Sequence, residues 1–286
     1  MNYVNLHSHT EYSNIRMLDS INTVKGLVKY TRELGMKGIA ITDHECLSAS
    51  MDISEINQEN KKNGIDYKIA IGNEIYLTKT RDKKQKFYHL ILIAKDEIGF
   101  RQLSALSSTA WYNSYYYRVL RVPTLYDELA DVIGKDLGHI ICSTACMAGE
   151  LSSNSLNLVE ARKKGLDGAE YKQNIIDFLK FLKSLFNDDL YIEIAPNATS
   201  SDQNEVNVMN VSVAKSMDIP VIFATDAHYL KKNDRLVHKA FLLSRPSEGD
   251  REVDAFYQAT YIMSFDEVVE QLAPCEFQIE EIEEWA

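Results

Sequence analysis

Short apolar runs rich in valine and isoleucine alternate with longer stretches of helical periodicity along most of this chain. The runs predict strands at Tyr3–His7, Gly38–Thr42, Lys68–Tyr76, His89–Lys95, His139–Ser143, Leu190–Ala195 and Val221–Thr225. The longer stretches predict helices at Ile21–Leu34, Glu97–Ser107, Leu156–Lys164, Tyr171–Phe186, Asn204–Met217 and Phe265–Leu272. Strands that alternate with helices form βαβ units, so the pattern predicts an α/β fold with a mainly parallel sheet.

Seven such strands can close into a barrel or stay open and doubly wound. No glycine-rich loop follows the first predicted strand, which removes the usual signal of a Rossmann or P-loop nucleotide site. The sequence "LTKTRDKKQK" at 77–86 is too short for a helical crossover, so we expect a hairpin there. Antiparallel pairing across that hairpin brings His89 beside Glu74.

The domain organisation follows from the same pass along the chain. No internal repeat or Gly/Ser linker divides the 286 residues. We therefore expect one catalytic domain at 1–243 and a tail at 244–286 that packs against it. Asp19 and Ser20 are placed to cap the first helix, and Gly35 follows its last turn.

Composition narrows the class of protein. No apolar stretch approaches the roughly 20 residues of a membrane helix, and no signal peptide is evident, so we expect a cytoplasmic protein without a membrane partner. Four scattered cysteines do not make a disulfide framework. The net charge of −11 argues against tight, non-specific binding of nucleic acid, and it suits carboxylates gathered around cations or an ordinary acidic surface.

Polar side chains follow the ends of the predicted strands, and imidazole and carboxylate groups dominate them. In chain order they are His7, His9, Asp43, His44, Glu74, His89, Cys142, Cys146, Glu150, Glu193, Asp226 and His228. The carboxyl ends of the strands in a parallel barrel form one rim, which carries the active site. Imidazole, carboxylate and a thiolate together suit Zn, Mn or Fe better than Mg or Ca.

Each of these motifs has a simpler interpretation when taken alone. "HSH" at 7–9 is either half of a metal site or two half-exposed histidines, and "TDH" at 42–44 is more often a turn. Burying the Glu74 carboxylate costs free energy unless it is paired or binds a metal. A salt bridge is therefore the alternative to a metal site. "TDAHY" after "PVIFA" repeats "TDH" after "GIAI". This recurrence in one ordered chain favours the metal site.

The chain resembles the PHP (polymerase and histidinol phosphatase) superfamily in seven ordered motifs. They are "NLHSHTEYS", "GIAITDH", "GNEIY", "HLILIAKDEIGFRQL", "STACMAGE", "LYIEI" and "VIFATDAHYL". The fourth and fifth motifs, with "FDEVVEQL" in the tail, resemble in particular the PHP domain of bacterial DNA polymerase III α subunits. The resemblance implies a distorted seven-stranded (β/α)7 barrel, similar to a TIM barrel, with up to three divalent metal ions.

The resemblance also implies which residues bind these ions. The first ion would be held by His7, His9, Glu74 and Asp226, the second by Asp19, His44 and His228, and the third by Glu74, His89 and Cys146. Asp19 departs from the family pattern, since serine follows it where the family has glycine. Inactive PHP domains usually lack several ligands, so a full set favours a working hydrolase.

Clustered divalent ions activate water and neutralise phosphoryl oxygens, which is the chemistry of phosphoester hydrolysis. We expect Glu74, Asp226 and His228 to be the catalytic residues. Asp43 and Glu193 are expected to orient the ligands, with capping or a buried ion pair as the alternative.

The polymerase branch implies a 3′–5′ exonuclease that acts on single-stranded DNA or a primer 3′ end. Substrate contacts are expected from the basic loop at 79–86, with Lys83 and Lys84. They are also expected from "WYNSYYYRVLR" at 111–121, with Tyr115, Arg118 and Arg121. Aromatic side chains interleaved with arginine are typical of base-stacking platforms. A solvated basic loop and an aromatic packing cluster are the simpler alternatives.

Three functions therefore stay open at this stage. The first is a metal-dependent exonuclease, the second is a phosphatase or pyrophosphatase on small substrates, and the third is a module that braces a replicative polymerase or another replisome subunit. No polymerase catalytic region follows "EEIEEWA". We expect a stand-alone protein, a split-gene product or an expressed domain.

Overall fold

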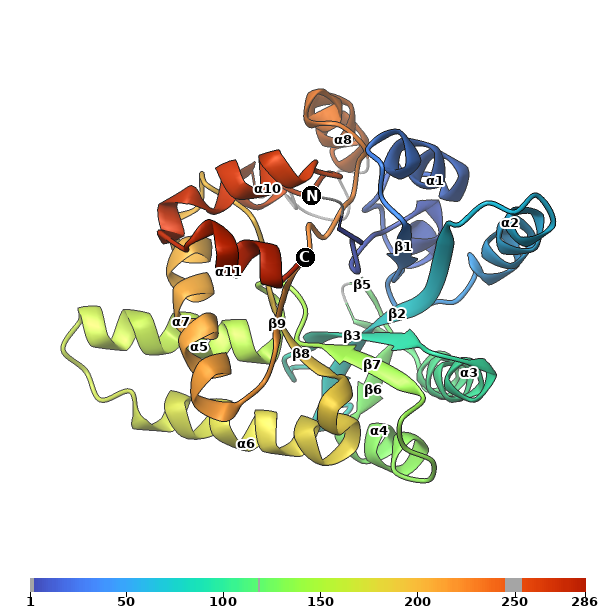
Figure 1. The fold of residues 1–286 in the computed structure, drawn as a ribbon. Coiled ribbons are helices and arrows are strands. Elements are labelled where there is room, and N and C mark those ends of the chain that lie inside the picture. The colour runs from blue at the N-terminus through green and yellow to red at the C-terminus, as the bar shows by residue number, and fades with distance from the viewer. Residues whose placement is uncertain (1–2, 118, 245–253) are drawn as a thin grey trace.

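The computed structural model describes residues 3–117, 119–244 and 254–286. Its main feature is a strongly curled seven-stranded sheet in the order β1-β2-β3-β7-β8-β9, with β6 paired to β2 (Figure 1). A second sheet consists of β4 and β5. The strands are β1 Gly38–Ile41, β2 Lys68–Thr78, β3 Tyr88–Ala94, β4 Tyr115–Tyr117, β5 Val119–Arg121, β6 Pro123–Leu125, β7 Ile140–Ser143, β8 Leu190–Ile194 and β9 Val221–Phe223.

The main sheet is mixed, because β3 runs antiparallel to both of its neighbours, β2 and β7. The other pairs, β1 with β2, β2 with β6, β7 with β8 and β8 with β9, are parallel. The expected hairpin between β2 and β3 is confirmed. Its register pairs Tyr76 with His89, so His89 enters the sheet next to the strand that carries Glu74.

Helices surround the curled sheet (Figure 1). They are α1 Val24–Glu33, α2 Ser50–Lys62, α3 Glu97–Tyr112, α4 Tyr126–Ile133, α5 Glu150–Lys163, α6 Ala169–Phe186, α7 Ser201–Met217, α8 Arg235–Leu242, α9 Asp254–Tyr257, α10 Phe265–Leu272 and α11 Ile279–Glu284. All six predicted helices are present. The expected cap of α1 is wrong, because the Thr23 side chain accepts the Gly26 N–H, and Asp19 lies elsewhere.

The first predicted strand, Tyr3–His7, is not a regular strand. Residues 5–9 instead span the gap between the edge strands, because Asn5 bridges Ile39 and Ser8 bridges Ala227. The Asn5 side chain donates to the carbonyl of His7, and its Oδ1 accepts the N–H of Thr225. Hydrogen bonds from side chains thus replace part of the backbone pairing between strands. The sheet curls around although residues 5–9 do not form a continuous strand.

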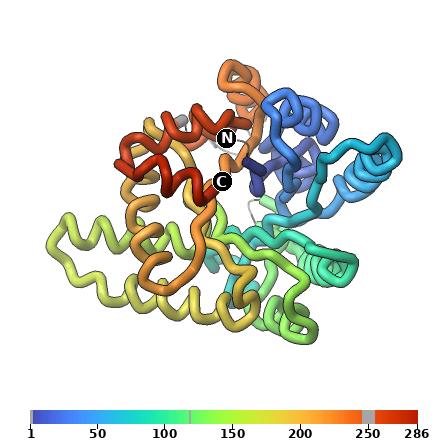
Figure 2. The backbone as a smooth tube through the Cα atoms, in the orientation of Figure 1, coloured from blue at the N-terminus to red at the C-terminus, as the bar shows by residue number. Residues whose placement is uncertain are grey.

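Residues near both ends of the chain share one hydrophobic core. Tyr3, Ile39 and Phe223 lie in it together with Ile262 and Val268. The Tyr3 hydroxyl donates to the carbonyl of Met263 at 2.7 Å, which ties the N-terminal segment to the C-terminal one (blue and red in Figure 2). The expected division of the chain at 243–244 stays a prediction.

Several elements were not predicted, and their local sequence explains why. Strands β4, β5 and β6 have three residues each, which is too short for a visible alternation of apolar and polar residues. Helix α2 buries only Ile53 and Asn60, so it has no apolar stripe to detect. Helix α5 begins at Glu150, six residues before the predicted start at Leu156, within the polar sequence "ELSSNS".

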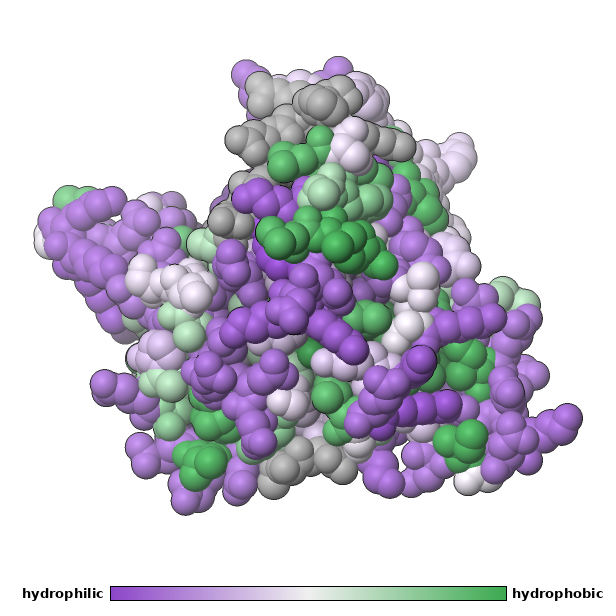
Figure 3. Space-filling view, turned by 90° about the horizontal axis from the view of Figure 1, so that it is seen from above, coloured by the Kyte–Doolittle hydropathy of each residue, from purple (hydrophilic) through white to green (hydrophobic). Residues whose placement is uncertain are grey.

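The surface seen in Figure 3 is mostly hydrophilic, with hydrophobic side chains in small groups. Among the described residues, no helix is both long and apolar enough to cross a membrane.

One buried carboxyl outside the strand ends predicts how stability changes with pH. Glu150 begins α5 and accepts a hydrogen bond from the hydroxyl of Tyr126, the first residue of α4. Burial raises the pKa of Glu150 from its ordinary 4.5 to about 7, against the opposing effect of Lys79 and Lys86. The folded chain therefore keeps this proton at pH values where the unfolded chain has lost it.

We predict that the protonated Glu150 stabilises the fold below pH ~4.5, and that this stabilisation, on the order of 2 kcal/mol, is lost as the pH rises to ~7. Glu150→Gln mimics the neutral acid at every pH. Urea unfolding at several pH values should show the variant gaining stability relative to the wild type between pH 5 and pH 8. A constant difference across this range would contradict the prediction.

Candidate metal centre

The polar strand ends converge on one cavity of about 490 Å³. His44 follows β1, Glu74 and His89 lie on β2 and β3, Cys146 follows β7, and Asp226 follows β9. His44, His89, Cys146, Asp226 and His228 line the cavity together with Asp19. His7, His9 and Glu74 lie directly behind them, fully buried. The structure thus brings together all of the residues expected to bind metal.

The first group of these residues contains His7, His9 and Asp226. The Oδ1 atom of Asp226 lies 3.2 Å from Nε2 of His7 and 3.0 Å from Nε2 of His9. Glu74 Oε1 lies 3.4 Å from the same nitrogen of His7. Two imidazoles and two carboxylates therefore face one point, which matches the expected first metal site.

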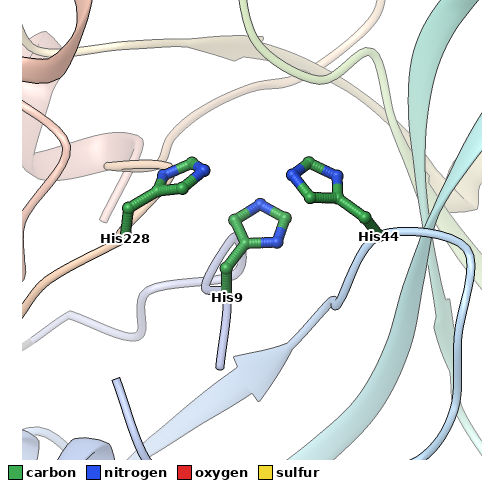
Figure 4. Close-up of side chains that lie close together, drawn as sticks. All are labelled: His9, His44 and His228. Atoms are coloured by element: carbon green, nitrogen blue, oxygen red, sulfur yellow. The ribbon is translucent and has the colours of Figure 1, made fainter. Parts of the chain in front are cut away.

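The second group contains His9, His44 and His228, whose rings point toward one another from three separate segments (Figure 4). Asp19 closes this group, because its Oδ2 lies 3.0 Å from Nε2 of His228 and also contacts Nε2 of His44. Asp19, His44 and His228 therefore have the arrangement expected for the second ion, although Asp19 departs from the family motif.

The third group contains His44, Glu74 and His89. Oε1 of Glu74 lies 2.7 Å from Nδ1 of His89, and its Oε2 contacts Nδ1 of His44. Cys146 Sγ lies 3.8 Å from Nδ1 of His89. Glu74 thus contacts members of all three groups, as a carboxylate that bridges metal ions would.

Buried atoms without hydrogen bonds test whether this donor set fits metal ions. Among the described residues, Oε1 and Oε2 of Glu74, Oδ1 of Asp226 and Nδ1 of His44 are buried and have no hydrogen-bond partner. Buried polar atoms in proteins are almost always paired, so atoms that only face one another need a further partner. Nitrogen and carboxylate donors gathered within 4.8 Å of one another suit divalent cations, and the residues therefore fit the group.

The buried carboxylates of the centre favour positive charge beside them. Burial raises the pKa of Glu74, but His89, His44 and His7 outweigh it and hold that pKa well below its usual range. Burial lowers the pKa of His44, but Glu74 and Asp19 outweigh it and raise the pKa to about 10. The carboxylates thus keep a proton on His44, and a divalent cation bound here would take over the charge of that proton.

Hydrogen bonds behind the centre fix which ring nitrogens face it. Nδ1 of His7 lies 2.7 Å from Oε1 of Glu193, which can only accept when it is ionised, so Nδ1 donates and Nε2 faces Asp226. Nδ1 of His228 donates in the same way to the carbonyl of Asp226 at 2.7 Å. Glu193 therefore lies where it was expected to orient a ligand.

Asp43 orients the opposite wall of the centre. It accepts the N–H and the hydroxyl of Thr10, and its Oδ1 accepts the hydroxyl of Ser13 at 2.7 Å. Ser13 Oγ lies 3.1 Å from Nδ1 of His9 and accepts the N–H of His44. Asp43 acts on both histidines through Ser13, which the sequence analysis did not single out.

The backbone turns sharply where three of the strand ends enter the centre. Glu45, Ala145 and Asp226 have positive φ angles of 53°, 60° and 46°. Such angles are uncommon for residues other than glycine and cluster at functional sites. A Cβ at Gly149 would lie 2.3 Å from the carbonyl of Thr144, so glycine is required to complete the turn that places Cys146.

The expected substrate contacts lie outside the cavity. Lys83 and Lys84 are exposed in the β2–β3 loop. The Tyr115 hydroxyl is 3.5 Å from the carbonyl of Asp82, and the Arg121 guanidinium lies 5.1 Å from the centre of the Phe87 ring. The β4–β5 hairpin thus packs on that loop. Arg118 lies outside the described residues.

Sequence reasoning missed several residues that line the cavity, among them Arg16 and Tyr76. Tyr76 packs its ring against His89 with 4.6 Å between the ring centres. It stands two residues after Glu74 on the same strand, so both side chains face the same side of the sheet. This two-residue spacing is the signal that could have identified Tyr76. Arg16, in an irregular segment, offered no such signal.

We predict that the metal content depends on Glu74. Wild-type protein saturated with Zn or Mn should hold up to three ions per chain by elemental analysis. Glu74→Ala should lose most of them, because Glu74 contacts all three groups. Glu193→Gln should keep its ions at saturation with about 10- to 100-fold weaker affinity, because Glu193 acts only through His7.

Glu128→Ala is the control for this measurement, since Glu128 pairs with Arg81 and does not line the cavity. Its ion content should equal that of the wild type. Equal ion content in Glu74→Ala, with the fold intact by circular dichroism, would contradict the bridging role.

Comparisons of the sequence with known proteins identify relatives of this chain. Over 285 residues the chain is 39% identical to the DNA-directed DNA polymerase of Bacillus phage SPbeta, which covers 94% of the chain and 22% of that protein. It is 32% identical over 252 residues to the DNA polymerase III subunit alpha of Aquifex aeolicus, covering 84% of the chain and 19% of that subunit. The chain thus spans about a fifth of the length of these relatives.

A distant structural likeness is a protein of Bifidobacterium adolescentis, assigned only provisionally as a metal-dependent phosphoesterase. Its TM-score is 0.44 and its identity 14%, over 94% of this chain and 96% of that one. The model of the PHP domain family matches residues 5–197, which is more than half of the chain. With this match and these relatives, the chain belongs to the PHP domain family.

Proposed function

We propose that the chain is a metal-dependent phosphoesterase that hydrolyses phosphodiesters at a DNA 3′ end, as a 3′–5′ exonuclease with three divalent ions. The observation that carries this proposal is the convergence of imidazoles and carboxylates on one open cavity, where buried oxygens of Glu74 and Asp226 face imidazoles and accept no well-formed hydrogen bond from the described residues. A purely structural core rarely leaves so many buried polar atoms without hydrogen bonds.

The chain's own residues divide the work. Glu74 and Asp226 would supply the negative charge that holds divalent ions close together, and the imidazoles of His7, His44 and His228 would be their further ligands. Divalent ions bound here would supply positive charge to the phosphoryl oxygens and lower the pKa of water. His228 borders the cavity with Nδ1 fixed by a carbonyl, so its Nε2, 3.0 Å from Oδ2 of Asp19, is placed to hold a metal or a proton there.

Three observations support DNA as the substrate. The relatives compared above are named as DNA polymerases, including a DNA polymerase III subunit alpha. The basic loop at 79–86 packs against the β4–β5 hairpin, so lysines and aromatic side chains lie close together. Tyr112 and Tyr116 are 90% and 75% exposed, so their rings are accessible for base stacking.

A phosphatase or pyrophosphatase acting on small substrates is the second candidate. One observation favours it: none of Lys83, Lys84, Tyr115 or Arg121 lines the cavity, whose volume of about 490 Å³ suits a small phosphate compound. A bracing role in a replicative polymerase is the third candidate, and it needs neither bound metal nor turnover.

We predict that the metal-loaded chain shortens a single-stranded oligonucleotide from its 3′ end. The assay uses a 5′-labelled oligonucleotide with Mn or Zn, beside pyrophosphate and a phosphate monoester. Asp226→Asn should lose activity by about 100-fold or more, as expected when a positioned catalytic group is removed. A control oligonucleotide of the same sequence with a blocked 3′ end should resist cleavage.

Turnover of only the small substrates would favour the phosphatase. If no substrate turned over and His9→Ala behaved like the wild type, the bracing role would stand and the hydrolase would be excluded.

A further inference from the structure

Arg16 borders the metal centre, although no motif pointed to it. It follows the 3₁₀-helix η1, Glu11–Ile15, and lines the same cavity as Asp19, His44 and His228. Among the described residues that line this cavity, it is the sole lysine or arginine. Its permanent positive charge therefore stands at the wall of a space whose other ionisable lining groups are mostly carboxylates and imidazoles.

The guanidinium of Arg16 is held in place by neutral groups. Nη2 donates to the Tyr76 hydroxyl at 2.7 Å, and Nη1 donates to the carbonyl of Leu120 at 3.2 Å. The charged carbon lies 4.3 Å from the centre of the Tyr76 ring. These contacts hold the side chain in one position without neutralising its charge. Little conformational entropy is therefore lost when a ligand binds to it.

No carboxylate forms an ion pair with Arg16 among the described residues, unlike Arg81, which pairs with Glu128 at 2.6 Å. Its Nε is buried and has no hydrogen-bond partner in the described part of the chain. A half-buried arginine that lines the cavity without an ion pair is poised to attract an anion there. Arginine favours phosphate, whose oxygens match the donors of a guanidinium.

We propose that Arg16 binds a non-bridging oxygen of the substrate phosphate and positions that phosphate against the metal centre. This inference rests on the proposed function and adds a positioning residue to it. Leu120 belongs to β5, so Arg16 also links the cavity to the β4–β5 hairpin. A phosphate held by Arg16 thus lies between the metal centre and the exposed aromatic side chains of the hairpin.

An alternative role for Arg16 is purely electrostatic support of the buried carboxylates. Arg16 opposes the effect of burial on the pKa of Glu45, which is nevertheless raised to about 8. This role would show as a loss of bound metal or of stability. A phosphate-binding role changes phosphate affinity and KM while the metal content stays constant.

The test uses three variants: Arg16→Gln, Arg16→Lys and Arg32→Gln. Arg32 is the matched control, because it also lies over a tyrosine ring, at 4.7 Å from the centre of Tyr67, and donates to the Asn60 side chain. It does not line the cavity. Both glutamine variants therefore lose a half-buried arginine with a similar setting, and only one loses it at the centre.

Binding of inorganic phosphate to the metal-loaded chains is measured by calorimetry, with ion content by elemental analysis. Arg16→Gln should bind phosphate about 10- to 100-fold more weakly than the wild type, with its metal content unchanged. Arg16→Lys should have a phosphate affinity between those of Arg16→Gln and the wild type. Arg32→Gln should have the same affinity as the wild type. KM for the oligonucleotide should rise in the same order.

Equal phosphate affinity in wild type and Arg16→Gln would overturn the inference, and so would loss of metal that accompanies the loss of affinity. Absence of phosphate binding by the wild type would overturn it as well. The proposed function fails separately: Arg16-dependent phosphate binding without any turnover would leave the inference standing and exclude the hydrolase. If Arg16→Gln turned over the oligonucleotide as fast and with the same KM as the wild type, the hydrolase would stand and the inference about Arg16 would be overturned.

Discussion

The buried carboxylate of Glu74 is the constraint on which the rest of the centre depends. Glu74 has no exposed surface, and neither of its oxygens has a hydrogen-bond partner among the described residues. A buried, ionised carboxylate is tolerated only when positive charge or a metal balances it. His7, His44 and His89 reach Glu74 from three segments, and other residues must hold each ring in place. Glu193 and the hydrogen-bonded residues Thr10, Ser13 and Asp43 provide much of this positioning.

The positions of these residues were predictable because strand ends are a strong signal. Apolar runs such as "GIAI" and "VIFA" end abruptly in acid and imidazole groups, and parallel strands bring their carboxyl ends to one edge. The β2–β3 hairpin was predictable from a connection too short for a helix. These local rules place His44, Glu74, His89 and Asp226 at the cavity without any knowledge of their contacts. Their roles as metal ligands stay a prediction that elemental analysis can test.

The remaining features depend on tertiary contacts that leave no local pattern. Residues 5–9 have the composition of a strand, but side chains such as Asn5 take the backbone partners that a strand would use. The helix cap expected of Asp19 is absent, and Asp19 meets His44 and His228, which the family resemblance had grouped with it but no local pattern had. Arg16 is one arginine among many in the sequence, and its place at the cavity wall over Tyr76 distinguishes it.

The tie between Tyr3 and Met263, 260 residues apart, also bears on how the protein is made. His7 and His9 are synthesised more than 200 residues before Ala227, the backbone partner of His9. The histidine-rich segment therefore waits without this partner while the residues between them are translated. Contacts this distant in sequence slow folding, so the groups around Glu74 can come together only after Asp226 and His228 have been synthesised.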